Sequence, residues 1–167
     1  MHLKINEINV IIDNHMWEEQ NQFNTWRQLI VSVFNRIMEI NECSGCSVNL
    51  LLTNNNTIRQ LNKNFRNIDK ATNVLSFPQL NNNNTKKPLS KLKDVNIGDL
   101  AMSYDVIIEE SKLFNKSFFD RCTHLFVHGV LHLLGMDHIE EDDRSMMESL
   151  EIKILAYFGI NNPYLVD

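Results

Sequence analysis

The sequence has little of what marks fibrous, disulfide-rich or membrane proteins. It holds five glycines and three prolines in 167 residues, which excludes a collagen-like chain. Its three cysteines, Cys43, Cys46 and Cys122, cannot form a disulfide framework, so we expect a reducing, cytoplasmic setting. Apolar runs such as residues 29–31 are far shorter than the roughly 18 residues that span a bilayer. We therefore expect no contact with a membrane.

The length and apolar content fit one compact globular domain. Of the residues, 43% are hydrophobic and 22% are charged. A chain of this size buries roughly 68–70% of its unfolded surface, so it can fold without a disulfide or a structural metal. We expect a single domain over residues 1–167, in which any bound metal serves chemistry.

Acidic residues are almost absent from residues 54–93. This segment has eight basic residues against the single acid Asp69, a formal charge of +7, while the rest of the chain has eight basic and twenty acidic residues, a formal charge of −12. Such a segment can attract phosphate groups even though the molecule is acidic overall. Taken alone, the charge favours the simpler interpretation that these lysines keep a loop soluble.

Hydrophobic periodicity predicts an α+β fold with strands and helices interleaved. Near residue 60, residues 55–57 are expected to cap a helix, and the last helix is expected to bury Met146, Leu150, Ile154 and Tyr157. A stretch rich in asparagine and lysine, at about residues 79–95, is predicted to be a mobile loop. The expected strands are 3–12, 47–53, 74–77 and 97–103, and the expected helices are about 23–38, 58–65, 105–115, 117–134 and 142–158.

Four of the six histidines lie within fifteen residues of one another, at positions 124, 128, 132 and 138. On a helix, residues four apart lie on one face, so His128 and His132 can offer two imidazoles to one ion. Gly135 can end the helix in a left-handed conformation and turn His138 back toward them. This H-x-x-x-H-x-x-G-x-x-H spacing is typical of a three-histidine zinc site whose fourth position stays open.

Two residues beside this motif are expected to have roles other than metal binding. His124 is expected to pack in the core or to orient a ligand rather than to bind metal. Asp137 either orients a histidine or caps the turn, and the sequence leaves both roles open. Metzincin peptidases share the histidine spacing but carry a glutamate as general base after the first histidine, where this chain has Gly129. A zinc peptidase is therefore the weaker enzyme hypothesis.

Two further segments extend the pattern beyond the histidines. Together with residues 65–78 and 97–100, the histidine motif resembles the bacterial YbeY family, whose members are single-strand-specific endoribonucleases also called rRNA maturation factors. The likeness runs in order from about residue 50 to Tyr164. It departs from the family at Asn67 and Ala71, where glycine and proline are common.

The resemblance implies a zincin-like α+β fold, with a small mixed sheet of about four strands flanked by four to five helices. It implies one zinc ion held by His128, His132 and His138, and it places Arg66 at the substrate phosphate, so that these four residues form the catalytic set. The expected partners are single-stranded RNA, rRNA and the ribosome or its subunits. The expected role is maturation of the 3′ end of the small-subunit rRNA and ribosome quality control.

Several features stay open or are set aside. The nucleophile is either a metal-activated water or the 2′-hydroxyl of the RNA. A non-catalytic, zinc-containing ribosome-assembly factor is a further alternative. Phe65, Phe77 and Tyr104 could stack on bases, but we expect them to pack in the core. The pair Cys43 and Cys46 has redox or half-zinc-site spacing, yet no second pair accompanies it.

Overall fold

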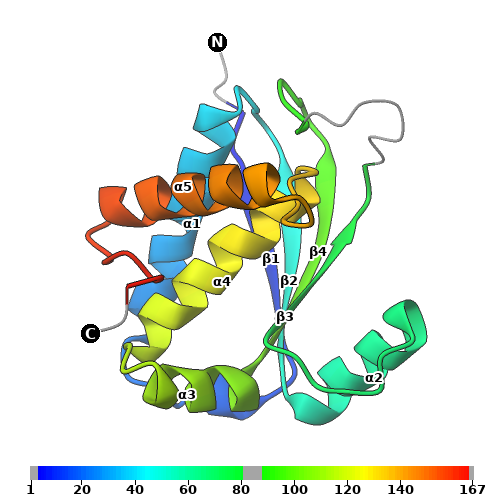
Figure 1. Ribbon diagram of the computed structural model, residues 1–167, viewed down its shortest axis with the longest axis vertical. Coiled ribbons are helices and arrows are strands. Elements are labelled where there is room, and N and C mark those ends of the chain that lie inside the picture. Colours follow the sequence, from blue (N-terminus) through cyan, green and yellow to red (C-terminus); the bar gives the residue numbers. More distant parts are fainter. Residues whose placement is uncertain (1–3, 81–87, 166–167) are drawn as a thin grey trace.

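In the computed structural model, residues 4–80 and 88–165 are described. They form a four-stranded sheet and five α-helices, which confirms the predicted α+β class (Figure 1). A short 3-10 helix, His15–Trp17, follows the first strand. The strands are β1 (Glu7–Ile12), β2 (Ser47–Thr53), β3 (Val74–Pro78) and β4 (Asn96–Ser103), and the helices are α1 (Phe23–Ile40), α2 (Asn55–Arg66), α3 (Tyr104–Leu113), α4 (Phe118–Leu133) and α5 (Glu141–Tyr157).

The sheet is mixed, as predicted. Its strand order is β1-β2-β4-β3, in which β1, β2 and β4 run parallel and β3 runs antiparallel to β4. Strand β3 is therefore an edge strand, and α4 packs beside it.

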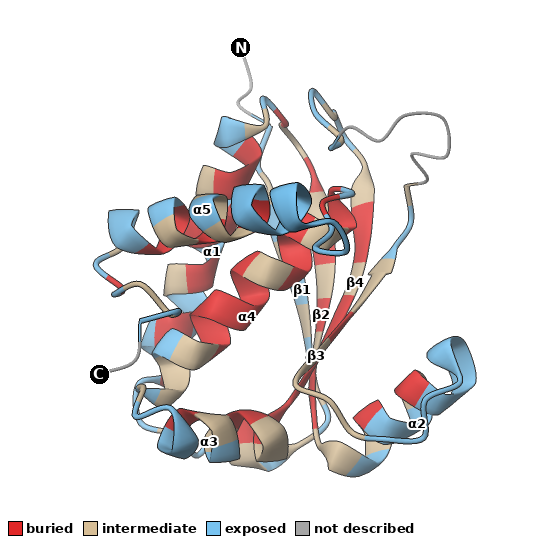
Figure 2. Cartoon of the chain, in the orientation of Figure 1, coloured by how far each residue is buried: buried red, intermediate tan, exposed pale blue. Residues whose placement is uncertain are grey.

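The main core lies between the sheet and helices α1 and α4. Figure 2 shows buried residues concentrated on α4 and on the strands beside it, whereas the outer surface of α5 is exposed. The Trp26 indole on α1 donates a hydrogen bond to the Thr123 hydroxyl on α4 at 3.1 Å, which ties the two helices together. Because strand residues alternate between faces, a smaller cluster of Ile58, Leu75 and Ala101 forms under α2 on the opposite face.

Helix α4 approaches the sheet closely at Gly129. A Cβ at this position would lie 2.8 Å from Cδ2 of the buried Leu100 on β4. The Ser76 hydroxyl on β3 donates a hydrogen bond to the Gly129 carbonyl at 3.2 Å. These contacts fix α4 against β3 and β4, and with it the histidines that α4 carries.

Two details of the predicted helices were wrong. The cap of α2 is Asn54, whose side chain accepts from the Thr57 amide at 3.1 Å, and not one of residues 55–57. On α5, Met146 is 59% exposed and Tyr157 is 65% exposed, although both were expected in the core. The buried residues of α5 are Met147, Glu151, Ile154 and Leu155.

The prediction of a mobile loop over about residues 79–95 falls partly on residues 81–87, which lie outside the described residues. Beyond them, the chain is tied to the body of the protein. The Leu89 amide donates to the Leu134 carbonyl at 2.7 Å, next to the end of α4, and the Leu92 carbonyl accepts from Ser44 at 2.9 Å. In the described part of the chain, no helix is both long enough and apolar enough to span a membrane.

Gly98 on β4 lies where β3 and β4 pack closely, so a substitution there tests this packing. Its φ is +138°, which L side chains rarely adopt, and a Cβ there would lie 2.4 Å from the Phe77 carbonyl oxygen. Since backbone strain and overpacking each cost roughly 1–3 kcal/mol, we expect Gly98→Ala to lower the free energy of unfolding by at least about 2 kcal/mol. Gly159→Ala is the control: its φ of +76° gives it backbone strain as well, but nothing lies within 4 Å of a Cβ at that position, so only the overpacking differs. Equal losses for the two variants in urea denaturation would contradict the packing argument.

Candidate metal centre

The three histidines of the motif come together at the C-terminal end of α4. His128 and His132 lie one turn apart on the same face, and their Nε2 atoms are 3.0 Å apart. The His138 ring lies 5.6 Å from the His128 ring and 5.1 Å from the His132 ring, measured between centroids. One nitrogen from each of the three residues lies within 4.8 Å of the other two.

The turn after α4 brings His138 back, as the sequence predicted from Gly135. This glycine has a φ of +88°, and its amide donates to the His132 carbonyl at 2.9 Å. The next amide, of Met136, donates to the Leu131 carbonyl at 3.0 Å. A left-handed residue followed by such a backward hydrogen bond is a common way to close a helix C-terminus and to reverse the chain.

Hydrogen bonds determine which ring nitrogen carries the proton in His128 and in His132. The Nδ1 atom of His132 lies 2.8 Å from the Met136 carbonyl oxygen, and the Nδ1 atom of His128 lies 2.7 Å from a Glu151 carboxylate oxygen. Both oxygens only accept, so both Nδ1 atoms donate and both Nε2 atoms keep a lone pair. Two lone pairs facing each other at 3.0 Å repel unless a proton or a cation lies between them.

This geometry fits a divalent metal ion. Tetrahedral zinc with Zn–N bonds of about 2.0–2.1 Å places its ligand nitrogens about 3.3 Å apart, close to the separation of the two Nε2 atoms. Burial, followed by the neighbouring charge of His128, lowers the pKa of His132 to about 4, so this imidazole is neutral near pH 7 and free to bind a cation. His138 is exposed and the other two histidines are partly buried, so the cluster is open to solvent on one side.

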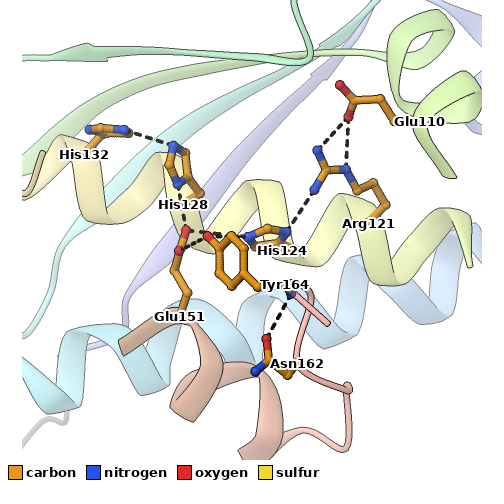
Figure 3. A network of polar contacts seen from close by, with 8 residues as sticks. All are labelled: Glu110, Arg121, His124, His128, His132, Glu151, Asn162 and Tyr164. Carbon is orange, nitrogen blue, oxygen red and sulfur yellow. Dashed lines mark hydrogen bonds and ion pairs between the residues drawn. The ribbon is translucent and has the colours of Figure 1, made fainter. Parts of the chain in front are cut away.

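A buried glutamate that the sequence analysis missed supports His128. Glu151 on α5 has no solvent exposure, and its second carboxylate oxygen accepts from the Tyr164 hydroxyl at 2.5 Å. Burial by itself raises the pKa of Glu151, but hydrogen bonds from His124, His128 and Tyr164 outweigh it and lower the pKa to about 2. The glutamate is therefore an anion, and Figure 3 shows it in contact with both His128 and Tyr164.

His124 and Asp137 lie outside the cluster of three. His124 is buried, and its Nε2 atom lies 3.6 Å from Glu151 and 3.3 Å from the Tyr164 hydroxyl, which agrees with a packing or orienting role. A carboxylate oxygen of Asp137 accepts from the Ile139 amide at 3.3 Å. Of the two roles that the sequence left open for Asp137, this contact favours capping the turn.

Arg66 is not in contact with the histidines. It is the last residue of α2 and is exposed, and Figure 1 shows this end of α2 well apart from the C-terminal end of α4. Among the described residues, no hydrogen bond or ion pair joins Arg66 to the cluster. On the same helix, Arg59 forms an ion pair with Asp69 at 2.7 Å, so part of the basic charge there is neutralised.

Among the aromatic residues considered for base stacking, Tyr104 and Phe65 differ in how far they are buried. Tyr104 is buried, as expected. Phe65 is 68% exposed, so the expectation that it packs in the core was wrong. Its ring meets the partly buried Phe77 ring edge-on at 5.4 Å, beside a hollow on the sheet face that α2 flanks.

The cysteines do not contribute to the cluster. All three are buried and unpaired. Burial raises the pKa of Cys46 and raises that of Cys122 well above its usual value, so both thiols stay protonated and unreactive. Within residues 4–80 and 88–165, one group of at least three potential metal ligands has its ligand atoms within 4.8 Å of one another. It consists of His128, His132 and His138.

Comparisons with a protein-family model and with a known relative both point to the same family. Residues 11–159 match the protein family described as Endoribonuclease YbeY. The chain is 37% identical over 142 residues to Endoribonuclease YbeY of Francisella tularensis subsp. novicida (strain U112), which covers 83% of this chain and 84% of the relative. The solution structure of TM1509 from Thermotoga maritima has a similar fold, with a TM-score of 0.56 at 19% identity, and the match covers 96% of this chain and 97% of that chain.

Proposed function

Since the chain belongs to the YbeY family of endoribonucleases, we propose that it is a metal-dependent, single-strand-specific endoribonuclease that acts in rRNA maturation and ribosome quality control. The observation that carries the proposal is the histidine cluster, in which two imidazoles of fixed tautomer turn their lone pairs toward each other. His128, His132 and His138 would hold one Zn²⁺ ion. When bound, zinc polarises a phosphate oxygen and lowers the pKa of water.

The side chains of this protein supply the rest of the chemistry. Cleavage of a phosphodiester builds negative charge on the non-bridging oxygens, and fixed positive charges at those oxygens stabilise the transition state. We assign Arg66 to the substrate phosphate. Because Arg66 lies at the end of α2, apart from the histidines, this role requires the bound RNA to bring the end of α2 and the metal centre to the same phosphate. The planar guanidinium of Arg66 can grip two oxygens and stays protonated at any working pH, and its exposed position at the end of α2 leaves it accessible to an RNA chain.

The preference for single strands follows from the difference in shape and stiffness between duplex and unpaired RNA. An A-form duplex is stiff and hides its base edges in a deep, narrow groove, whereas an unpaired strand can bend toward the metal centre. Lys63, also in the last turn of α2, adds positive charge that supports binding of such a strand outside the centre itself. We expect the protein to meet rRNA, with the ribosome or its subunits, in the cytoplasm.

Cleavage of labelled RNA by the purified protein tests this function. We expect single-stranded RNA to be cut and a matched duplex to stay intact, with activity lost on chelation and restored by Zn²⁺. A product with a 2′,3′-cyclic phosphate would identify the RNA 2′-hydroxyl as the nucleophile. Peptide cleavage without RNA cleavage, or ribosome binding without any cleavage, would overturn the proposal.

A further inference from the structure

A chain of polar contacts runs from the surface of α3 to the metal centre. It begins at Glu110 on α3, whose carboxylate binds the Arg121 guanidinium at 2.8 Å. Arg121 contacts Nδ1 of His124 at 3.0 Å, and Nε2 of His124 lies 3.3 Å from the Tyr164 hydroxyl. The Tyr164 hydroxyl then reaches Glu151, as Figure 3 shows. The contacts therefore connect the N-terminal half of α4 with its metal-binding end.

In this series of polar contacts, the partner of each group determines where its proton lies. A guanidinium only donates, so Nδ1 of His124 must accept and Nε2 of His124 must carry the proton. That proton points toward Tyr164 and Glu151, so the Tyr164 hydroxyl accepts from His124 and donates to Glu151. Glu151 is thereby surrounded by donors and remains an acceptor.

The same logic fixes the side of His128 that faces the cluster. Its Nδ1 atom can only donate to the Glu151 carboxylate, at 2.7 Å, so its Nε2 atom carries the lone pair. A carboxylate acceptor also strengthens the imidazole as a metal ligand, as carboxylates do for histidines at known metal sites. A neutral amide in place of the carboxylate would weaken this effect without changing the size of the side chain.

Tyr164 comes from the C-terminal segment, beyond residue 159, where the family match ends. The segment folds back over α4. Ile160 is 8% exposed, and the Tyr164 amide donates to the Asn162 side chain at 2.9 Å in a local turn. The Tyr164 ring packs edge-on against His124 at 5.3 Å between centroids.

From this geometry we propose that Glu151 is the positioning residue for His128, and that Tyr164 holds Glu151 in place. The C-terminal segment then sets how tightly the three histidines bind a divalent cation. The inference rests on the metal centre of the proposed function and adds two residues to it. Loss of such supporting hydrogen bonds around a metal site typically lowers metal affinity about 10–100-fold.

The test uses three variants of the full chain. Tyr164→Phe removes one hydroxyl, Glu151→Gln removes the charge at constant size, and Tyr157→Phe is the matched control, because Tyr157 is exposed on α5. The dissociation constants for Zn²⁺ and Co²⁺ are measured by chelator competition, and the Co²⁺ absorption spectrum reports the ligand geometry. Circular dichroism and thermal unfolding of the metal-free proteins check the fold.

We expect Glu151→Gln to weaken metal binding about 10–100-fold and Tyr164→Phe to weaken it by several-fold with a shifted Co²⁺ spectrum, while Tyr157→Phe matches the wild type. Because Tyr164 acts through Glu151, the double variant should bind nearly as well as Glu151→Gln alone. Wild-type affinity and spectrum in Tyr164→Phe would overturn the inference even if Glu151→Gln does not fold. Where Glu151→Gln folds, losses that multiply in the double variant would overturn it too.

The outcome is separable from that of the proposed function. If the wild type binds the cation and cleaves RNA but Tyr164→Phe is unaffected, the inference fails and the nuclease proposal stands. If the wild type binds the cation, Tyr164→Phe weakens binding, and no RNA is cleaved, the inference stands and the nuclease proposal fails.

Discussion

Replacing His132 by alanine is expected to abolish tight metal binding and to reduce RNA cleavage to background. The substitution removes one of the three nitrogens expected to bind the metal. This atom is Nε2 of His132, which lies 3.0 Å from Nε2 of His128. The loss should exceed the about 10–100-fold that removal of an outer hydrogen-bond partner costs, because a direct ligand is missing. Elemental analysis of the purified variant measures the bound metal, and cleavage of single-stranded RNA measures activity.

The control for His132→Ala is His15→Ala. The His15 side chain is 77% exposed on the short helix after β1, so this variant should keep both metal and activity. Because the sequence has apolar content for a core of its own, His132→Ala is expected to fold without metal, which circular dichroism checks. Retention of one equivalent of metal together with RNA cleavage in His132→Ala would contradict the assignment.

Replacing Arg66 by alanine has the second largest expected effect, and it should separate binding of the metal from catalysis. Arg66 does not contact the histidines, so metal content should be unchanged. Removing a group that stabilises transition-state charge typically lowers kcat by about 10²–10³-fold, and we expect a loss of this size for single-stranded RNA. Steady-state cleavage and metal analysis on the same preparation measure both quantities.

Arg27→Ala is the matched control for Arg66→Ala. Arg27 is also exposed but lies on α1, where its guanidinium sits 5.9 Å from the Phe23 ring centroid. Its loss should change cleavage little. Full activity in Arg66→Ala would remove Arg66 from the mechanism, and loss of bound metal would show that it supports the centre instead.

The histidine cluster was largely predictable because its three members are close in the sequence. The helical repeat places His128 and His132 on one face, and Gly135 provides the left-handed turn that returns His138. Local rules of this kind do not depend on how distant elements pack. The strands were predictable for a similar reason, since short runs rich in β-branched and apolar residues such as 47–53 have a strong local signal.

Glu151 was not predicted because the first half of the buried face of α5 was placed one residue too early, at Met146 and Leu150, although Ile154 was predicted correctly. Met146 and Tyr157 fit the apolar pattern but are exposed, whereas a glutamate occupies a core position. A charged residue in the register of Met147 and Ile154 was the available signal. It has a physical reason only once His128 and Tyr164, from two other segments, are seen to donate to it.

The relation of Arg66 to the histidines was beyond local reasoning as well. It depends on how α2 and α4 sit relative to the sheet, and they pack on opposite faces of it. The exposed Phe65 is a related case, because an apolar residue on an amphipathic helix is normally buried. The sheet face under the end of α2 leaves this ring uncovered.

X-ray absorption spectroscopy of the zinc-loaded protein is the most direct test of the account. We expect three imidazole nitrogens and one further light atom at about 2.0–2.1 Å from the metal, with the outer-shell signal of histidine rings. A sulfur ligand at about 2.3 Å, fewer than three imidazoles, or failure to take up one equivalent of zinc would contradict it.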